Sequence, residues 1–413
     1  MSRRSRRRRA AVVVLPALFL FSLAESSLAQ ESEFPAFRFD GQFRLRGEAD
    51  GRTAGVDPDA ATLSRIRGGV QVSLLDWIRV YAQLQDARAW GTEDNTLTDA
   101  SAELFDLHQG YADLGKTDGF TARLGRQSMG LADERLVGAV EWTNTGRAFD
   151  GVRVFGEYKG VTWTAFWMNV AERDELLTVG VHPQLNQGIN DDGWFIGGFA
   201  TRKFGDVTSE LTALFDRDAI TEESYTLNLR VHGRTGSVVY EGAAAYQGGP
   251  GRSAYFASGK AGLAIGRGTV AAQLDYLSGD SDTADAETKA FNTLYATNHK
   301  FYGYMDYFLD IPGQLDEAGL VDALLRGTLT TSQSTNVRLD LHRFLTAQKR
   351  NGERALGTEL DLVGRWQIEQ PATLEAGVGI FVPEDLASDL LSAFADGKNT
   401  TWWGYLQLIL NWP

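Results

Sequence analysis

Arginine is the residue through which this chain could act on a partner. A guanidinium stays charged at every physiological pH, and its planar fork matches the two oxygens of a carboxylate. Eight arginines fall on the polar face of segments in which apolar and polar residues alternate: Arg38, Arg44, Arg46, Arg65, Arg67, Arg79, Arg123 and Arg153. Fixed charges along a wall of low dielectric constant concentrate ions of opposite sign. We therefore predict that these arginines line a path for an anionic cargo, which weak binding at many sites would allow to move on.

Acidic residues on the polar faces of later segments give a second interpretation of the same arginines. They are Glu241, Asp275, Asp340, Glu359, Asp361 and Glu375. Charges inside a protein are usually paired, so these carboxylates could face the arginines across an interior and brace the fold. The sequence leaves selective anion passage, bracing or both open.

Two long segments between the alternating ones could narrow such an interior. Ser128–Gly146 carries Asp133, Glu134 and Arg135, and Ser278–Gly319 carries the run Asn298, His299 and Lys300. Loops of this length without secondary structure are often functional. Their side chains could stack on sugars and bond to them, or they could hold the loops down, and both interpretations stay open.

Catalysis and metal binding find little support in the sequence. The five histidines are scattered at His108, His182, His232, His299 and His342. No nucleophile motif or metal-ligand spacing accompanies them, and Asn298-His299 is the one pair that an enzyme could use. The chain has no cysteine, which excludes disulfides and thiolate metal sites. We predict a protein that is not an enzyme and needs no cofactor or metal.

The C-terminal segment Thr401–Trp412 shows most clearly which elements position the arginines. Leu406, Leu408 and Leu410 fall on one face of an extended strand, and polar Gln407 falls on the other. One apolar and one polar face fit the wall of a transmembrane β-barrel, which meets lipid outside and a wet lumen inside. The edge strand of a soluble sandwich is the alternative for this segment alone.

The spacing of turns extends this prediction to the whole chain. Eighteen alternating segments lie between Phe37 and Trp412. The connections between them alternate between short turns and a second set of loops. The loops of this second set are mostly long, and the set includes Gly248–Ser253 and Thr346–Glu353. This alternation is typical of outer-membrane barrels, which have short periplasmic turns and long external loops. An arginine facing lipid at mid-bilayer costs about 2–4 kcal/mol, so the arginines must face the lumen. We predict an all-β fold, a transmembrane antiparallel β-barrel of about eighteen strands. The faces of Leu104–Leu114 and Trp163–Asn169 cannot be assigned from the pattern.

The N-terminus indicates export from the cytoplasm. Arg6–Arg9 form a basic region, Ala10–Leu23 an apolar one, and small residues allow cleavage after Ala29. We predict a signal peptide over residues 1–29 and a single barrel domain over residues 30–413. Cleavage removes six arginines and one glutamate, so the formal net charge falls from −14 to −19. Such an acidic chain argues against a nucleic-acid partner.

Three blocks of the sequence carry a family resemblance. Leu124–Gly138, Trp142–Arg153 and Ala296–Asp306 resemble the signature of the alginate export family of outer-membrane barrels. The resemblance implies a monomeric eighteen-stranded barrel in the bacterial outer membrane, whose best-known members pass a polyuronate through an arginine-rich constriction.

The expected partners are outer-membrane lipid and lipopolysaccharide, and an anionic polysaccharide or oligosaccharide as cargo. The sequence leaves open whether a periplasmic export partner docks at the short turns. The alternative within transport is a general uptake porin for small anions or oligosaccharides.

Overall fold

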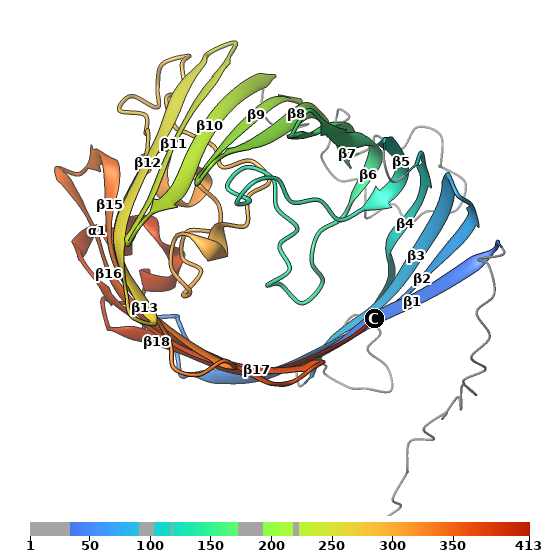
Figure 1. Cartoon of the computed structure of the whole chain (residues 1–413). Coiled ribbons are helices and arrows are strands. Elements are labelled where there is room, and N and C mark those ends of the chain that lie inside the picture. The colour runs from blue at the N-terminus through green and yellow to red at the C-terminus, as the bar shows by residue number, and fades with distance from the viewer. Residues whose placement is uncertain (1–33, 91–102, 117–118, 172–192, 218–222) are drawn as a thin grey trace, which may run out of the picture.

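The computed structural model describes residues 34–90, 103–116, 119–171, 193–217 and 223–413. The predicted signal peptide lies outside the described residues. Within them, eighteen antiparallel strands form one sheet that closes on itself (Figure 1). The strands are β1 (Ala36–Gly51), β2 (Asp59–Leu75), β3 (Ile78–Trp90), β4 (Glu103–Leu114), β5 (Phe120–Gln127), β6 (Phe149–Tyr158), β7 (Val161–Ala171), β8 (Gly193–Phe204), β9 (Val207–Arg217), β10 (Ser224–Thr235), β11 (Val238–Gly249), β12 (Arg252–Ile265), β13 (Gly268–Leu277), β14 (Leu320–Thr330), β15 (Thr335–Arg350), β16 (Glu353–Glu369), β17 (Ala372–Pro383) and β18 (Thr401–Trp412).

Closure of the sheet is made by the first and last strands. Each strand pairs with its neighbours in the chain, and β18 pairs with β1 from Gly41↔Trp412 to Gly51↔Trp402. A closed sheet has no free edge, so its backbone groups are paired around the whole wall. The prediction from the last segment of the chain is confirmed, since Thr401–Trp412 closes the barrel.

The two faces of the wall follow the alternation in the sequence. In β10, Tyr225, Leu227 and Leu229 leave about half of their side-chain surface exposed, whereas Thr226 and Asn228 are buried. Apolar side chains outside and polar side chains inside are the reverse of a soluble protein and match a wall between lipid and a wet lumen. The predicted transmembrane antiparallel barrel is confirmed.

Short helical turns occur in the long connections at one end. They are η1 (Asn298–Lys300), η2 (Gly313–Leu315), α1 (Asp385–Leu390) and η3 (Ser392–Phe394). No helix among the described residues has the length and apolar character needed to cross a bilayer. We call this end of the barrel the long-loop end and the opposite end, where both β1 begins and β18 finishes, the short-turn end.

Two connections at the long-loop end are tighter than the sequence analysis placed them. Strands β11 and β12 stay paired to Gly249↔Arg252. Strands β15 and β16 shift register after Leu345↔Ala355 and pair again at Arg350↔Glu353, so each of the two connections ends in a two-residue turn. The Asn351-Gly352 turn has positive φ at both residues, the geometry of a type I′ hairpin that this dipeptide favours. The predicted boundaries at Thr346–Glu353 were wrong because polar residues there continue the strands.

One of the two segments whose faces could not be assigned, Leu104–Leu114 in β4, contains a bulge. Gln83 pairs with Gln109 but the next residue, Leu84, pairs with Leu107, so His108 is an extra residue in β4. A bulge breaks the period of two, so the residues on either side of it do not follow one alternation.

An apolar core fills part of the barrel interior at the long-loop end. The segment between β13 and β14 packs there against β15, β17 and the segment that carries α1 and η3. Its largest fully buried side chains include Phe291, Phe308, Ile311, Phe344, Phe381 and Phe394. The lumen therefore contains packed protein as well as water-facing side chains.

Candidate functional site in the barrel lumen

Two segments enter the lumen and join each other there (Figure 1). We call Ser128–Ala148, between β5 and β6, the inner loop, and Ser278–Gly319, between β13 and β14, the long loop. A parallel bridge pairs Val137 with Tyr295. The Gly138 N–H donates to the Tyr295 carbonyl at 2.8 Å, and the Tyr295 N–H donates to the Leu136 carbonyl at 2.9 Å. Backbone pairing between the loops makes them one constriction.

Glu134 and Lys300, both put forward by the sequence, lie at this junction. The Thr297 hydroxyl donates to the Glu134 carboxylate at 2.7 Å, and the Lys300 Nζ lies 2.9 Å from it. The Thr297 N–H also donates to the Glu134 carbonyl at 3.0 Å. These contacts tie the inner loop to the long loop through a charged pair that faces the lumen.

Four of the predicted arginines hold the tip of the inner loop. Arg44 and Arg46 from β1 and Arg65 and Arg67 from β2 are buried, and we call them the arginine wall. Their guanidinium groups donate to backbone carbonyls of the tip: Arg44 to Glu141 (2.8 Å) and Thr143 (2.7 Å), Arg46 to Trp142 (2.8 Å), Arg65 to Thr143 (3.3 Å) and Arg67 to Thr145 (2.9 Å). A wall of the barrel and a loop about a hundred residues away in the chain are thus bonded directly.

Glu141 supplies the loop's own carboxylate to this wall. Its Oε2 lies 2.8 Å from Arg67 and 3.0 Å from Arg65, while about half of its side chain faces the lumen. Burial alone would raise the pKa of the Glu141 carboxyl, but the charges of Arg67 and Arg65 outweigh burial and hold the pKa below its usual range. Glu141 therefore remains ionised and bound to the wall at neutral pH.

The positive charge of the arginine wall is only partly neutralised. Besides Glu141, the carboxylate of the described residues that contacts it is Glu48, 2.7 Å from Arg46. Buried Nε atoms of Arg44 and Arg65 have no hydrogen-bond partner among the described residues. Four guanidinium groups against two carboxylates leave an excess of positive charge beside the constriction.

The other predicted arginines differ in their partners. Arg123 binds Asp113 with two bonds, at 2.7 and 3.0 Å, and Arg79 approaches the same carboxylate at 3.9 Å. Arg153 donates from Nε to the Thr164 hydroxyl at 3.0 Å and has no carboxylate within 4.0 Å in the described part of the chain. Arg38 is exposed at the short-turn end, also without such a partner there.

Arg135 anchors the base of the inner loop to the opposite wall. Its Nη1 lies 2.6 Å from fully buried Asp275 of β13, and its Nε lies 3.2 Å from Asp133. The guanidinium also covers the Phe301 ring, 4.1 Å from the ring centre. Burial would lower the pKa of Arg135, but the charge of Asp275 outweighs it and raises the pKa. Asp133 in turn contacts Arg230 at 3.4 Å.

Asn298 and His299 make structural contacts within the constriction. Asn298 Nδ2 donates to the Thr293 hydroxyl at 2.9 Å, and His299 Nδ1 lies 2.6 Å from Asp306. The His299 ring stacks on Trp142 with 4.1 Å between ring centres and an interplanar angle of 8°. Both residues are buried. Of the pair that sequence reasoning put forward for catalysis, His299 packs the long loop against the inner loop, and Asn298 forms hydrogen bonds within the long loop.

Sequence reasoning missed Asp113 and left open whether the aromatic side chains of the two loops, Trp142 among them, stack on sugars or hold the loops down. Trp142 lies among five aromatic or cationic groups, with the Arg46 guanidinium 4.3 Å from its ring centre. Asp113, which binds two arginines, follows the bulge in β4 that hides its facing. Among the described residues, no group of three or more His, Asp or Glu could hold a metal ion.

Comparison with known proteins gives a family and a fold. The family model described as "Alginate export" matches residues 36–350. Among solved structures, the chain is similar to a BenF-like porin from Pseudomonas fluorescens Pf-5, with a TM-score of 0.63 and 10% identity over 91% of this chain and 98% of that one. Pseudomonas aeruginosa OpdK with vanillate gives a TM-score of 0.62 and 12% identity over 91% and 98% of the two chains. Acinetobacter baumannii OccAB1 gives 0.59 and 11% over 91% and 96%. No curated protein matches the chain.

Proposed function

This chain belongs to the alginate export family of the bacterial outer membrane, and we propose that it is a passive channel for saccharides that carry carboxylates, such as a polyuronate. The channel itself follows from the family and from the eighteen-stranded barrel shared with outer-membrane porins. The anionic cargo is our proposal, and the chemistry of the lumen supports it.

The observation that carries the proposal is the excess positive charge of the arginine wall. Most of its hydrogen bonds go to backbone carbonyls of the inner loop, which satisfy the donors without cancelling the charge. The carboxylates of Glu141 and Glu48 cancel half of it. In a lumen with low-dielectric walls, the remaining charge attracts carboxylates to the narrowest region.

Passage requires that the cargo also leaves. Each guanidinium of the arginine wall already has protein partners, so a passing carboxylate finds a positive field with few free donors. Binding of this kind is weak at any single site, which allows a chain of uronate units to move from one site to the next. No energy source is needed, because concentration alone drives the flow.

A general uptake porin for small anions or oligosaccharides is the second candidate, and the anchoring of the inner loop favours it. Arg135–Asp275 fixes the base of the loop and Glu141–Arg67 fixes its tip, so the constriction is held at both ends. A loop fixed in this way limits cargo width. One solved relative of the fold, OpdK, was determined with the small carboxylate vanillate, and a small acid is the cargo that this alternative would assign here.

The barrel can function as a single chain. Within the described residues β1 pairs with β18, so the wall needs no second subunit to satisfy an edge. We propose a monomer embedded in outer-membrane lipid and lipopolysaccharide, with a periplasmic export partner, if the flow is outward, docking at the short-turn end.

Current recordings with saccharides of defined length test the proposal. Uronate oligomers of two to eight units should block single-channel current, and neutral glucose oligomers of the same lengths should block it much less. If short uronates pass and longer ones only block, the uptake porin is favoured over the polymer channel. Equal blockade by charged and neutral oligomers at every length would remove the support for an anionic cargo.

A further inference from the structure

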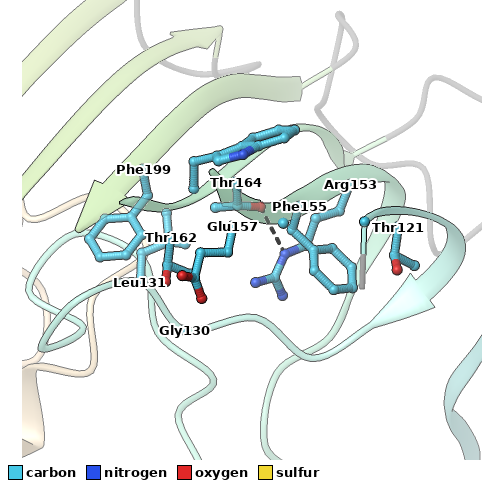
Figure 2. A pocket seen from close by; sticks show the side chains of 12 residues that line it. Thr121, Gly130, Leu131, Arg153, Phe155, Glu157, Thr162, Thr164 and Phe199 are labelled. Atoms are coloured by element: carbon cyan, nitrogen blue, oxygen red, sulfur yellow. Dashed lines mark hydrogen bonds between the residues drawn. The ribbon is translucent and has the colours of Figure 1, made fainter. Parts of the chain in front are cut away.

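A cavity of about 540 Å³ lies between the inner loop and the wall formed by β5 to β8. Figure 2 shows it from close by. Its lining includes Leu131 from the inner loop and Thr121, Arg153, Phe155 and Phe199 from the wall. Sites for small molecules typically measure about 300–1,000 Å³. The cavity therefore has room for one or two sugar-sized rings.

Arg153 is oriented in this cavity without being neutralised. Its Nε donates to the hydroxyl of buried Thr164 at 3.0 Å, the bond drawn dashed in Figure 2. No carboxylate of the described residues lies within salt-bridge distance of it, whereas its neighbour Arg123 is fully engaged by Asp113. One bond at Nε leaves the terminal amino groups of the guanidinium for a ligand, and these are the groups that match a carboxylate.

Phe155 provides an apolar face beside that cation. The Arg153 guanidinium carbon lies 4.9 Å from the Phe155 ring centre, and Phe199 lies on the other side of the cavity in Figure 2. Thr121 and Thr162 add hydroxyl groups that both donate and accept. A free guanidinium, a ring face and nearby hydroxyls together fit a ring that carries one carboxylate.

Glu157 sets the strength of such binding. It belongs to the same lining, at the end of β6 on the short-turn side, and is exposed. Its charge opposes a second carboxylate and weakens the hold on the first, so that the ligand does not stay bound. A transport station needs this balance between entry and exit.

We propose that the cavity is a binding station for a carboxylate carried on a six-membered ring, placed on the short-turn side of the constriction. The station rests on the proposed function, because its ligand reaches it through the lumen. A sugar acid and an aromatic acid share this chemistry, and the experiment below separates the two sources.

The test uses the full barrel in detergent and measures binding of glucuronate, benzoate and glucose by calorimetry. Glucuronate or benzoate should bind in the millimolar range, and glucose should not. Arg153→Gln should weaken binding about tenfold or more, because a charge-assisted bond is lost. Arg153→Lys should recover part of it, since the charge remains and the fork does not. Lys159→Gln removes an exposed cation from the neighbouring turn and should change affinity less than twofold.

Each outcome has a defined meaning. Binding of glucuronate alone assigns the station to sugar acids, and binding of benzoate alone assigns it to aromatic acids. No binding of either acid, or equal loss in Arg153→Gln and Lys159→Gln, would overturn the station. The reversal potential of the same protein sample reports the proposed function separately, so an anion-selective channel without acid binding would overturn the station alone. Heat-modifiable migration in gels verifies that each variant is folded.

Discussion

The Glu141 carboxylate of the inner loop lies 2.8 Å from the Arg67 guanidinium of the barrel wall. This ion pair joins the tip of the inner loop, which connects β5 and β6, to β2, and it leaves half of the carboxylate facing the pore. Two consequences follow, one for the size of the pore and one for its charge.

Glu141→Gln should loosen the tip of the inner loop. The carboxylate is half exposed, so we expect a local loss of stability on the order of 1 kcal/mol. Single-channel recordings should show larger conductance and more current noise, with little change in the melting temperature of the barrel. Asp285→Asn, an acid in the long loop outside this contact, is the control and should leave conductance unchanged. If Glu141→Gln changes neither the conductance nor the current noise, the hydrogen bonds from the arginine wall to backbone carbonyls of the loop are enough to hold it.

The same pair predicts the response of the pore to pH. The pKa of Glu141 is lowered in the folded protein, so its stabilising effect is complete above the unfolded value of about 4.3 and is lost as pH falls through the lower folded value. The part of the conductance that depends on Glu141 should therefore be constant from about pH 5 to pH 8 and should increase only at more acidic pH. Glu141→Gln should remove this acid transition. A transition near neutral pH that is present in the wild type and absent from Glu141→Gln would contradict the assignment.

The base of the inner loop should matter more for stability than its tip. Asp275 is fully buried against Arg135, and removing one partner of a buried pair costs about 3–5 kcal/mol. Arg135→Met should lower the unfolding free energy by about this amount, as measured by urea titration in detergent. The double variant Arg135→Met/Asp275→Asn should lose less, because no unpaired charge remains. Similar losses in the single and double variants would argue that packing, and not charge, carries the effect.

The outer face of β10 tests the position of the barrel in the bilayer. Leu229 is half exposed near the middle of the strand, so Leu229→Arg places a cation in lipid and should cost about 2–4 kcal/mol. Folding into lipid vesicles, followed by heat-modifiable migration, should become much less efficient. His232→Arg on the lumen side of the same strand keeps a partner for Glu210 and should fold normally.

Local alternation carried most of the fold prediction. In β10 the sequence separates Leu229 from Arg230 correctly because every second residue meets lipid. The same reasoning failed in β4, where His108 is an extra residue that interrupts the alternation. A bulge is defined by how a strand pairs with its neighbour, so the residue types of the strand alone do not predict it. The Asn351-Gly352 hairpin did carry a local signal, and its flanking polar residues concealed the continuing strands.

The hydrogen-bond partners of side chains in the lumen were harder to predict from the sequence than the face of the barrel wall on which each side chain lies. The sequence analysis put Arg44 on the inner face, but its acceptors, the carbonyls of Glu141 and Thr143, lie about a hundred residues away. Backbone carbonyls are present at every residue and cannot be recognised by residue type. For the same reason the sequence left anion passage and bracing open, and the structure shows arginines bound to a loop that itself narrows the pore.

The reversal potential across a planar bilayer under a salt gradient tests the central claim most directly. The arginine wall keeps more positive than negative charge, so the wild-type channel should prefer anions although the chain without its predicted signal peptide carries a formal net charge of −19. Arg44→Gln, which removes one charge whose bonds go to loop residues, should shift the potential toward cations without closing the pore. A wild-type channel that prefers cations would contradict an arginine-directed path for anions.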